Sequence, residues 1–291
     1  MKPTGLFSGL TTVDLVHYVE RFPAPDEKIQ AHGCWMGAGG PAANAAAAFA
    51  ALGGKAWLVT AIGGGALGGV AVADLEANGV EVIDCCSGGE LAVSGVFVDR
   101  DGRRIVASRN AEAIGAHRAP GRLRDLPAAD VVALDAHFPR LAALVLERAS
   151  RSSAPVVLDP GNWKPHLPAL MVSCGHIVAS CSLDRAASPR DLLARLQRHR
   201  PVLAAVTRGA APIEACFEGV AATIDVPAAR AIDTLGAGDV LHGAYAYHLG
   251  AGRQPLEALA AAAVVAARSC EHRGPRISVS RGPAESLPAG K

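Results

Sequence analysis

The stretch Asp233-Thr234-Leu235-Gly236-Ala237-Gly238-Asp239 leads directly into a segment of small and apolar residues, 240–250. A glycine-rich turn that opens a helix leaves backbone N–H groups without partners, and these groups bind anions together with the positive end of the helix dipole. A carboxylate at Asp239 would repel a bound phosphate unless it accepts a proton from the nucleophile that attacks the phosphate. The stretch therefore predicts one half of a phosphoryl-transfer site.

Three simpler interpretations of this stretch stay open on the local sequence alone. Asp239 could complement the helix dipole, Asp233 and Thr234 could form an N-cap, and the glycines could make a tight turn. Because short glycine motifs match by chance often, the choice depends on the rest of the chain.

The composition excludes several classes of partner. The chain has 291 residues, of which 50% are hydrophobic and 4% aromatic, and its formal net charge is +1. A chain of this length can bury a large core, and its charge gives no reason to expect nucleic acid or an anionic membrane. The sequence shows no membrane span and no signal peptide, and its seven cysteines contain no Cys-x-x-Cys. We therefore expect a reduced, cytoplasmic protein with no nucleic-acid or membrane partner.

Short apolar runs alternate with longer helical patterns along most of the chain. The expected strands are 5–10, 56–62, 80–84, 131–134, 156–159, 176–179 and 202–207, and the expected helices lie near 41–52, 67–78, 139–150, 189–199, 239–249 and 255–271. This alternation predicts an α/β fold with a mostly parallel central sheet and helices on both faces. A further hairpin is expected at 211–224.

Two segments, 15–36 and 91–109, break the alternation with strand-like stretches and no helix between them. The second contains Asp99-Arg100-Asp101-Gly102, which is a hairpin-turn signal. We expect both to be insertions in a single domain, 1–291, that pair into a small β-sheet. Such a sheet would form a lid over the carboxyl end of the parallel sheet, where ligands of open α/β folds bind. Its free edges could pair with a second lid, which suggests a homodimer.

A second glycine cluster, 63–68, suggests a different activity. It contains Gly-x-Gly-x-x-Gly between an expected strand and an expected helix, and Asp84 ends the next strand near the spacing of a ribose-binding acid. An NAD(P)-dependent oxidoreductase would have this pattern, but a tight turn also explains the glycines. Because the cluster follows the second strand and leaves 233–239 unexplained, we favour the turn.

A third cluster is Gly37-Ala38-Gly39-Gly40-Pro41-Ala42-Ala43-Asn44. Pro41 suits the first turn of a helix, because its missing N–H costs nothing there. Asn44 follows within one turn, so its amide can point back toward exposed backbone that suits hydrogen bonding to a polyol. Asp14 ends the first strand region and can accept two hydroxyl protons from a sugar. A solvent-facing Asn44 and a capping role for Asp14 remain open.

Together these separated motifs resemble those of the pfkB, or ribokinase-like, family of carbohydrate kinases. Residues 233–239 match the carboxyl-terminal signature of that family, and 39–44 resemble its amino-terminal signature. Asp14 falls where the family keeps a sugar-binding acid, and the expected small sheet corresponds to the family's lid. The sequence of residues 236–243 is most similar to that of bacterial fructokinases, ketohexokinases and sulfofructose kinases.

The resemblance implies an ATP-dependent sugar kinase. Such an enzyme transfers the γ-phosphoryl group of ATP to a hydroxyl, expected to be primary, of a ketohexose-like or related sugar. Asp239 would be the general base. The backbone N–H groups of Gly236, Ala237 and Gly238 would hold the charge of the transferring group.

The resemblance also implies further binding residues. The sugar would be held by Asp14, Lys28, Gly39, Gly40, Asn44, Asn110 and His137, with Lys28 reaching any anionic substituent. The nucleotide would be held by Thr207, Gly209, Thr234, Gly236 and Gly238, and Mg²⁺ by Asp233 and Asp184 through water.

One departure from the family keeps alternatives open. The family often has Asn-x-x-Glu where this chain reads Ser180-Cys181-Ser182-Leu183-Asp184, so Asp184 is only a substitute. A sugar- or nucleotide-binding regulator with impaired catalysis would explain this departure. A nucleoside kinase is an alternative inside the family, although few aromatic residues are available to stack a base. Whether the sugar is neutral or anionic stays open.

Overall fold

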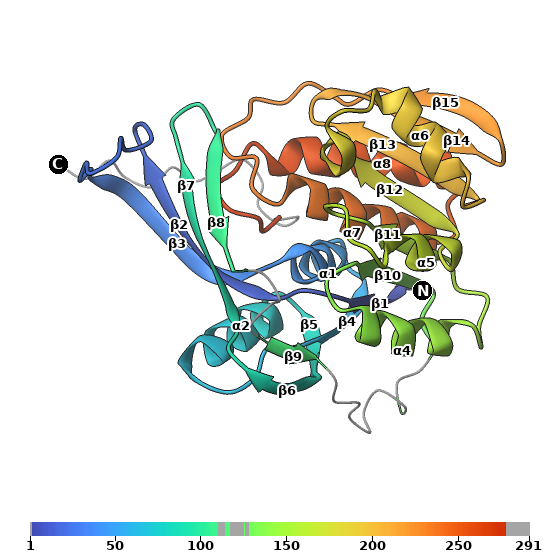
Figure 1. Cartoon of the computed structure of the whole chain (residues 1–291), viewed down its shortest axis with the longest axis horizontal. Helices are drawn as coiled ribbons and strands as arrows, with labels where there is room; N and C mark the ends of the chain where they lie inside the picture. The colour runs from blue at the N-terminus through green and yellow to red at the C-terminus, as the bar shows by residue number, and fades with distance from the viewer. Residues whose placement is uncertain (1, 110–113, 117–124, 126–127, 278–291) are drawn as a thin grey trace.

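A central sheet of nine strands carries helices on both of its faces in the computed structural model (Figure 1). The structure describes residues 2–109, 114–116, 125 and 128–277. The strand order is β15-β14-β13-β12-β11-β10-β1-β4-β5. In chain order these strands are β1 (Thr4–Ser8), β4 (Lys55–Thr60), β5 (Val80–Asp84), β10 (Val131–Asp135), β11 (Val156–Asp159), β12 (His176–Ser180), β13 (Leu203–Arg208), β14 (Ala211–Phe217) and β15 (Val220–Ile224).

The sheet is mostly parallel, as the sequence predicted. Every neighbouring pair from β5 to β13 is parallel, and the pairs β13–β14 and β14–β15 are antiparallel. These last two strands form the expected hairpin, whose turn uses Glu218 and Gly219 at positive φ. The carboxyl ends of the parallel strands therefore lie along one edge, where open α/β folds bind ligands.

Two separate apolar cores cover the two faces of the sheet, because successive side chains of a strand point to opposite faces. Phe7 of β1 packs in one core and its neighbour Leu6 in the other. The first core is covered by α1 (Pro41–Ala51), α2 (Ala66–Ala77), α7 (Ala237–Gly250) and α8 (Pro255–Ser269), and the second by α4 (Pro139–Ala149), α5 (Leu167–Val172) and α6 (Pro189–Gln197).

Helices α1 and α7 cross in close contact, which brings the start of one toward the start of the other. Residues 42–48 of α1 are all buried, and all but Asn44 are alanine. At the crossing, a Cβ atom on Gly243 would lie 2.2 Å from the carbonyl oxygen of Ala45. The absence of a side chain at Gly243 thus sets the distance between the two helices.

A second sheet projects from the central sheet as the expected lid (Figure 1). Its strand order is β3-β2-β7-β8, and its strands are β2 (Thr12–Val19), β3 (Ala31–Gly39), β7 (Ala92–Val98) and β8 (Arg104–Ser108). The lid is longer than the segment 15–36 predicted, because Thr12 already pairs with Gly39. The third glycine cluster is therefore partly strand.

Four short elements were not expected from the sequence. Helix α5 has six residues and the 3₁₀ helix η1 (Cys181–Asp184) four, so neither is long enough to repeat a helical pattern. A two-stranded sheet pairs β6 (Cys86–Gly89) with β9 (Ile114–Ala116), and the Cys-Ser-Gly-Gly of β6 has no apolar alternation. None of the helices in the described part of the chain has the length and hydropathy of a transmembrane span.

Gly243→Ala should destabilise the protein, because the new methyl group would collide with backbone of α1 rather than with a flexible side chain. Overpacking of this kind lowers the free energy of unfolding by about 1–3 kcal/mol, which urea denaturation would measure. Gly69→Ala is the matched control, since a Cβ there on exposed α2 meets nothing within 4 Å. It should stabilise by about 0.5–1 kcal/mol. Equal stability of the two variants would contradict the close crossing.

Candidate active site

The glycine stretch before α7 forms an open helix N-terminus. Gly236, the residue before the helix, has φ +72°, a left-handed conformation that favours glycine, and no described side chain caps this helix end. The N–H of Ala237 is already engaged, at 3.3 Å from the carbonyl oxygen of Thr234. A Cβ atom on Gly238 would meet nothing within 4 Å, so this helix end borders open space. An uncapped helix N-terminus beside open space fits a phosphate group.

Asp233 holds this stretch in place. Its buried carboxylate accepts the N–H groups of Leu235 at 2.8 Å and of Gly274 at 2.9 Å. It also accepts the hydroxyl of the lid residue Tyr18 at 3.2 Å. Protein donors surround this carboxylate, so the structure gives it a role in loop shape rather than the metal role expected from the sequence.

Asp239, in the first turn of α7, lies against Asn44 of α1. The amide Nδ2 of the buried Asn44 donates to Asp239 Oδ2 at 2.7 Å. Burial raises the pKa of Asp239 to about 6, with further raising by the carboxylates of Asp159 and Asp14. The Asn44 hydrogen bond and His242 act in the opposite direction. A carboxylate poised near neutral pH can accept a proton from a substrate.

His242 places a positive charge behind Asp239. Its Nδ1 lies 2.8 Å from the carbonyl oxygen of Gly238, and its Nε2 lies 2.8 Å from that of Val178. Carbonyl oxygens only accept, so both nitrogens can be satisfied only when the ring carries two protons. Burial alone would lower the pKa of His242, but Asp159, whose Oδ2 is 3.6 Å from Nδ1, and the two carbonyls raise it.

Asp14 of β2 faces the same site from the lid. It accepts the Thr12 hydroxyl at 2.7 Å, and burial raises its pKa against the effect of its hydrogen bonds and of Arg276. A Cβ atom on Gly39 would lie 2.1 Å from Asp14 Oδ2, and one on Gly40, at φ +94°, would lie 2.4 Å from the carbonyl oxygen of Leu10. The glycines therefore make room for the carboxylate. The structure brings Asp14, Asn44 and Asp239 together.

His137 lies at the same edge of the sheet, just after β10. Its Nδ1 is 3.1 Å from Asp135 Oδ1, and although burial alone would lower the pKa of His137, Asp135 raises it. Asp135 also accepts the N–H groups of Leu10 at 2.8 Å and of Ala42 at 3.3 Å. It thereby joins the start of the lid and the start of α1 to β10.

Two other predicted sugar contacts are not placed at the site. Lys28 is exposed in the connection beyond the Val19–Ala31 pair, whereas Asp14 pairs with Gly37. Five residues of strand, about 17 Å, separate Asp14 from that end of the hairpin. Asn110 lies outside the described residues.

The predicted nucleotide contacts lie at the carboxyl end of β13 and in the loop before α7. Thr207, the next-to-last residue of β13, has its hydroxyl 3.4 Å from the carbonyl oxygen of Ala179. Gly209 turns the chain at φ +58°, and a Cβ atom there would meet nothing within 4 Å. This open backbone fits a phosphate chain that runs toward α7.

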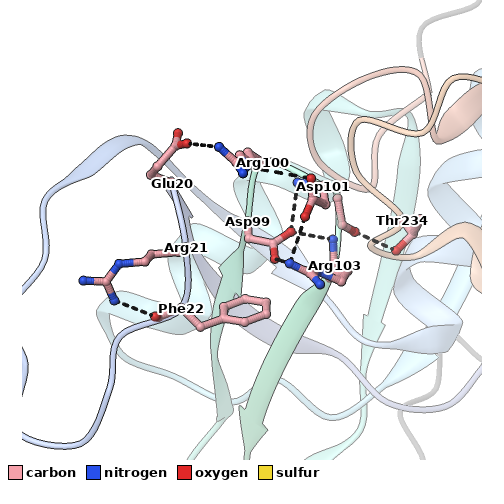
Figure 2. Close-up of polar contacts among 9 residues, drawn as sticks. Glu20, Arg21, Phe22, Asp99, Arg100, Asp101, Arg103 and Thr234 are labelled. Atoms are coloured by element: carbon pink, nitrogen blue, oxygen red, sulfur yellow. Dashed lines mark hydrogen bonds and ion pairs between the residues drawn. The ribbon is translucent and has the colours of Figure 1, made fainter.

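Thr234 connects the loop before α7 to the lid. Its hydroxyl donates to the carbonyl oxygen of Gly102 at 3.2 Å and accepts Arg104 Nη1 at 2.6 Å. Figure 2 shows the lid turn, braced by the Asp99–Arg103 ion pair, beside Thr234. The lid and the loop before α7 are thus in direct contact.

Asp184 does not fit its expected metal role. Its carboxylate forms an ion pair with Arg195 and accepts the N–H of Ala186 at 3.0 Å. Across the described residues, no group of three or more His, Cys, Asp or Glu side chains is placed to hold a metal ion without a nucleotide.

The structure also argues against the dinucleotide interpretation, because Asp84, its expected ribose-binding acid, is engaged elsewhere. The Asp84 carboxylate accepts the N–H groups of Ile62 at 2.9 Å, Gly63 at 3.1 Å and Cys86 at 2.9 Å. It closes its own turn on the edge strand β5, where the sheet order does not reverse. The structure therefore supports the tight turn at 63–68.

A family model supplies the identification. The model described as pfkB family carbohydrate kinase matches residues 6–281. The chain belongs to the pfkB family of carbohydrate kinases. The signatures at 39–44 and 233–239 are therefore those of a pfkB chain, and the lid and central sheet are its two sheets.

Known proteins similar to this pfkB chain are named as sugar and sugar-phosphate kinases. The ATP-dependent ribose-1-phosphate kinase of Halopiger xanaduensis is 32% identical over 161 residues, 54% of this chain and 53% of that protein, so the match spans about half the length of this curated relative. The crystal structure of a candidate ribokinase from Agrobacterium tumefaciens has a TM-score of 0.86 at 28% identity, covering 94% of this chain and 93% of the other. Arabidopsis thaliana ribokinase complexed with ribose and ATP has a TM-score of 0.75 at 23% identity, covering 94% of each chain.

Sequence reasoning missed four residues of this pfkB site. Asp135 and Asp159 end neighbouring parallel strands, a position that could have marked them as ligand-edge carboxylates. His242 lies one turn after Gly238, but nothing local predicts a buried charged ring. Arg276, whose guanidinium donates to Asn44 Oδ1 at 2.7 Å, follows the last helix and has no sequence signal.

The charged state of His242 predicts a pH-dependent stability. The pKa of His242 in the folded protein is raised above the unfolded value of 6.5, so its contribution is complete below that pH and is lost as pH rises through the folded pKa. Each unit of difference contributes about 1.4 kcal/mol. Urea unfolding from pH 6 to 9 should show wild type losing stability relative to His242→Gln. Parallel curves would mean that the ring is neutral.

Proposed function

We propose that this protein is an ATP-dependent sugar kinase with Asp239 as its general base. The observation that carries the proposal is the position of Asp239 in the first turn of an uncapped helix, next to Asn44 and facing Asp14. Such an N-terminus binds a transferring phosphoryl group, while the carboxylate receives a proton from the acceptor hydroxyl.

In the proposed reaction, each bond that forms is matched by a bond that breaks. The acceptor hydroxyl gives its proton to Asp239, and its oxygen forms a bond to the γ-phosphorus as the bond to ADP breaks. Asp239 Oδ2 is engaged by Asn44, so Oδ1 is the oxygen that takes the proton. The N–H groups of Gly236 and Gly238 stabilise the charge on the phosphoryl oxygens, and each such donor typically contributes about 10²–10³ in rate.

The sugar is held opposite the base. Asp14 Oδ1 accepts the Thr12 hydroxyl, so its second oxygen can accept sugar hydroxyls. Gly39 and Gly40 pack closely beside it, and a bulkier residue at either position would collide with its neighbours.

ATP lies between the end of β13 and the start of α7 in this proposal. The open positions at Gly209 and Gly238 accept its phosphates. In this proposal Mg²⁺ enters with ATP, since Asp233 and Asp184 are both held by protein donors. The ion neutralises phosphate charge.

We propose a five-carbon sugar or its phosphate as the acceptor ahead of a ketohexose. Several of the similar proteins are named for ribose or ribose 1-phosphate, and one is an adenosine kinase. A cationic group near the site, the ammonium of Lys164, would tolerate a phosphate on the sugar. Burial lowers the pKa of Lys164, and the nearby carboxylates of Asp135 and Asp159 partly offset this effect.

An ADP-release assay tests the function and the acceptor together. The panel contains ribose, ribose 1-phosphate, ribose 5-phosphate, fructose and adenosine. ADP formation with a pentose compound supports the proposal, and formation with fructose or adenosine alone reassigns the acceptor. Calorimetric binding of sugar and ATP with no ADP from any compound would instead support a regulator without catalysis.

Asp239→Asn should lower kcat by at least about 10²-fold, the usual contribution of a positioned base. In wild type, kcat/KM should fall below about pH 6, because protonated Asp239 cannot accept the hydroxyl proton. Steady-state kinetics from pH 5 to 8.5 measure both effects. Glu147→Gln, on an exposed ion pair of α4, should match wild type. Full activity of Asp239→Asn would disprove the role of the base.

We also propose that two copies pair through the outer face of the lid. This face exposes four apolar side chains from four neighbouring strands: Leu15, Met36, Val93 and Ile105. Leu15 and Met36 are register partners, so they lie side by side. The opposite face of the lid holds Asp14, so pairing leaves the site accessible.

Ile105→Glu should convert the proposed dimer to a monomer, because it places a charge in the apolar face. Light scattering after size-exclusion chromatography, at about 1–100 μM protein, measures the molecular mass. Val220→Glu, on the edge strand β15, is a matched exposed control. A monomeric wild type over this range would contradict the proposal.

A further inference from the structure

Arg276 approaches the candidate base from a segment without a recognised motif, after α8. Its side chain is 16% exposed, so its guanidinium is largely removed from water. A buried guanidinium needs acceptors on several sides, because it has five donors and remains charged.

Three acceptors from three elements meet this guanidinium. Nη1 donates to Asn44 Oδ1 of α1 at 2.7 Å. Nη2 donates to the carbonyl oxygen of Ala38 in β3 at 2.5 Å and to Asp74 Oδ2 of α2 at 2.6 Å. The ring of Trp35 lies 5.8 Å from the guanidinium carbon.

The contacts with Ala38 complete the edge of the lid. β3 is an edge strand that pairs only with β2 in its sheet. The N–H of Ala38 donates to Asp74 at 3.1 Å while its carbonyl accepts Arg276. The Asp74–Arg276 pair therefore takes the place of a neighbouring strand immediately before Gly39 and Gly40.

The contact with Asn44 has a defined direction. Arginine only donates and an ionised carboxylate only accepts. The amide of Asn44 lies between them, so its oxygen must face Arg276 and its nitrogen must face Asp239. Removal of Arg276 would remove one of the two groups that fix this orientation and leave the Asn44 amide held by Asp239 alone.

We infer that Arg276 is a positioning residue that orients the Asn44 amide toward Asp239 and fixes the lid strand beside the sugar site. This inference rests on the proposed role of Asp239 as base. Arg276 itself touches neither reacting atom; it acts through Asn44 and Ala38.

The first effect of losing Arg276 falls on catalysis. A misdirected amide would lower kcat, since displacement of a reacting group by about 1 Å can cost 10²-fold. KM for ATP should change little, because the contacts of Arg276 lie on α1, α2 and the lid rather than at Thr207 or Gly209.

A second effect falls on the pH profile. Loss of the Asn44 hydrogen bond should raise the pKa of Asp239 and move the acid limb of kcat/KM upward. The other charged groups that act on Asp239 are Asp159 of β11, Asp14 of β2 and His242 of α7. The variants keep all three residues, but loss of Arg276 also raises the pKa of Asp14, which Arg276 lowers in wild type.

The test compares Arg276→Met, Arg276→Lys, Arg276→Ala, Asn44→Ala and the double variant Asn44→Ala/Arg276→Met. With the best acceptor and MgATP, Arg276→Met should lower kcat by about 10- to 100-fold. Arg276→Lys should recover only part, since one ammonium cannot reach Asn44, Ala38 and Asp74 together. The double variant should be no worse than Asn44→Ala, because both changes break one chain of contacts.

Chemical rescue separates positioning from general stability. Added guanidinium at millimolar concentration should restore activity to Arg276→Ala, and it should do nothing for Asp239→Asn. Arg151→Met, which breaks the exposed ion pair between Arg151 and Glu147, should match wild type. If Arg276→Met does not fold, Arg276→Lys and the rescued Arg276→Ala test the inference in its place.

Two results would overturn the inference. One is wild-type kcat and an unchanged acid limb in Arg276→Met while Asp239→Asn is inactive. The other is full additivity of the Asn44 and Arg276 changes. If Asp239→Asn is itself fully active, the proposed function fails first, which distinguishes the two ideas.

Discussion

The hydrogen bond between Asn44 and Asp239 joins residues 195 positions apart, and the candidate site is arranged around it. It can form only because α1 and α7 cross almost backbone to backbone, at Gly243 and Ala45. Both helices begin after a glycine at positive φ. No described side chain caps α7, whereas the Asp135 carboxylate accepts the N–H of Ala42 at the start of α1. The alanine-rich composition of these helices thus serves the site as well as the core, because small side chains allow the approach.

Charge balance is the second constraint on this space. Burial raises the pKa of Asp239, and the nearby carboxylates of Asp159 and Asp14 raise it further. His242 acts in the opposite direction on Asp239, and Arg276 does so on Asp14. Like charges in a site of low dielectric disfavour one another's ionised forms, and nearby cations favour them. The two cations therefore favour the ionised carboxylates of Asp239 and Asp14.

The lid depends on contacts that tie it to the catalytic loop rather than on a core of its own. Its own buried cluster has only Val16, Tyr18, Val96 and Val98. Tyr18 donates to Asp233, Gly102 accepts Thr234, and Arg276 holds Ala38. Three hydrogen bonds thus join the second sheet to residues 233–234 and to Arg276.

The sequence by itself determined the order of strands and helices, the lid segments and the residues Asp14, Asn44 and Asp239. Periodicity and glycine motifs are local, so they can be read from neighbouring residues. Short elements such as α5 and β6 escaped because they span less than two periods. Only the tertiary structure decided that Asp233 and Asp184 are held by protein donors, and that His242 and Arg276 surround the base. Those roles depend on contacts across as many as 232 positions, and no local pattern records which distant chain segment a helix crossing brings near.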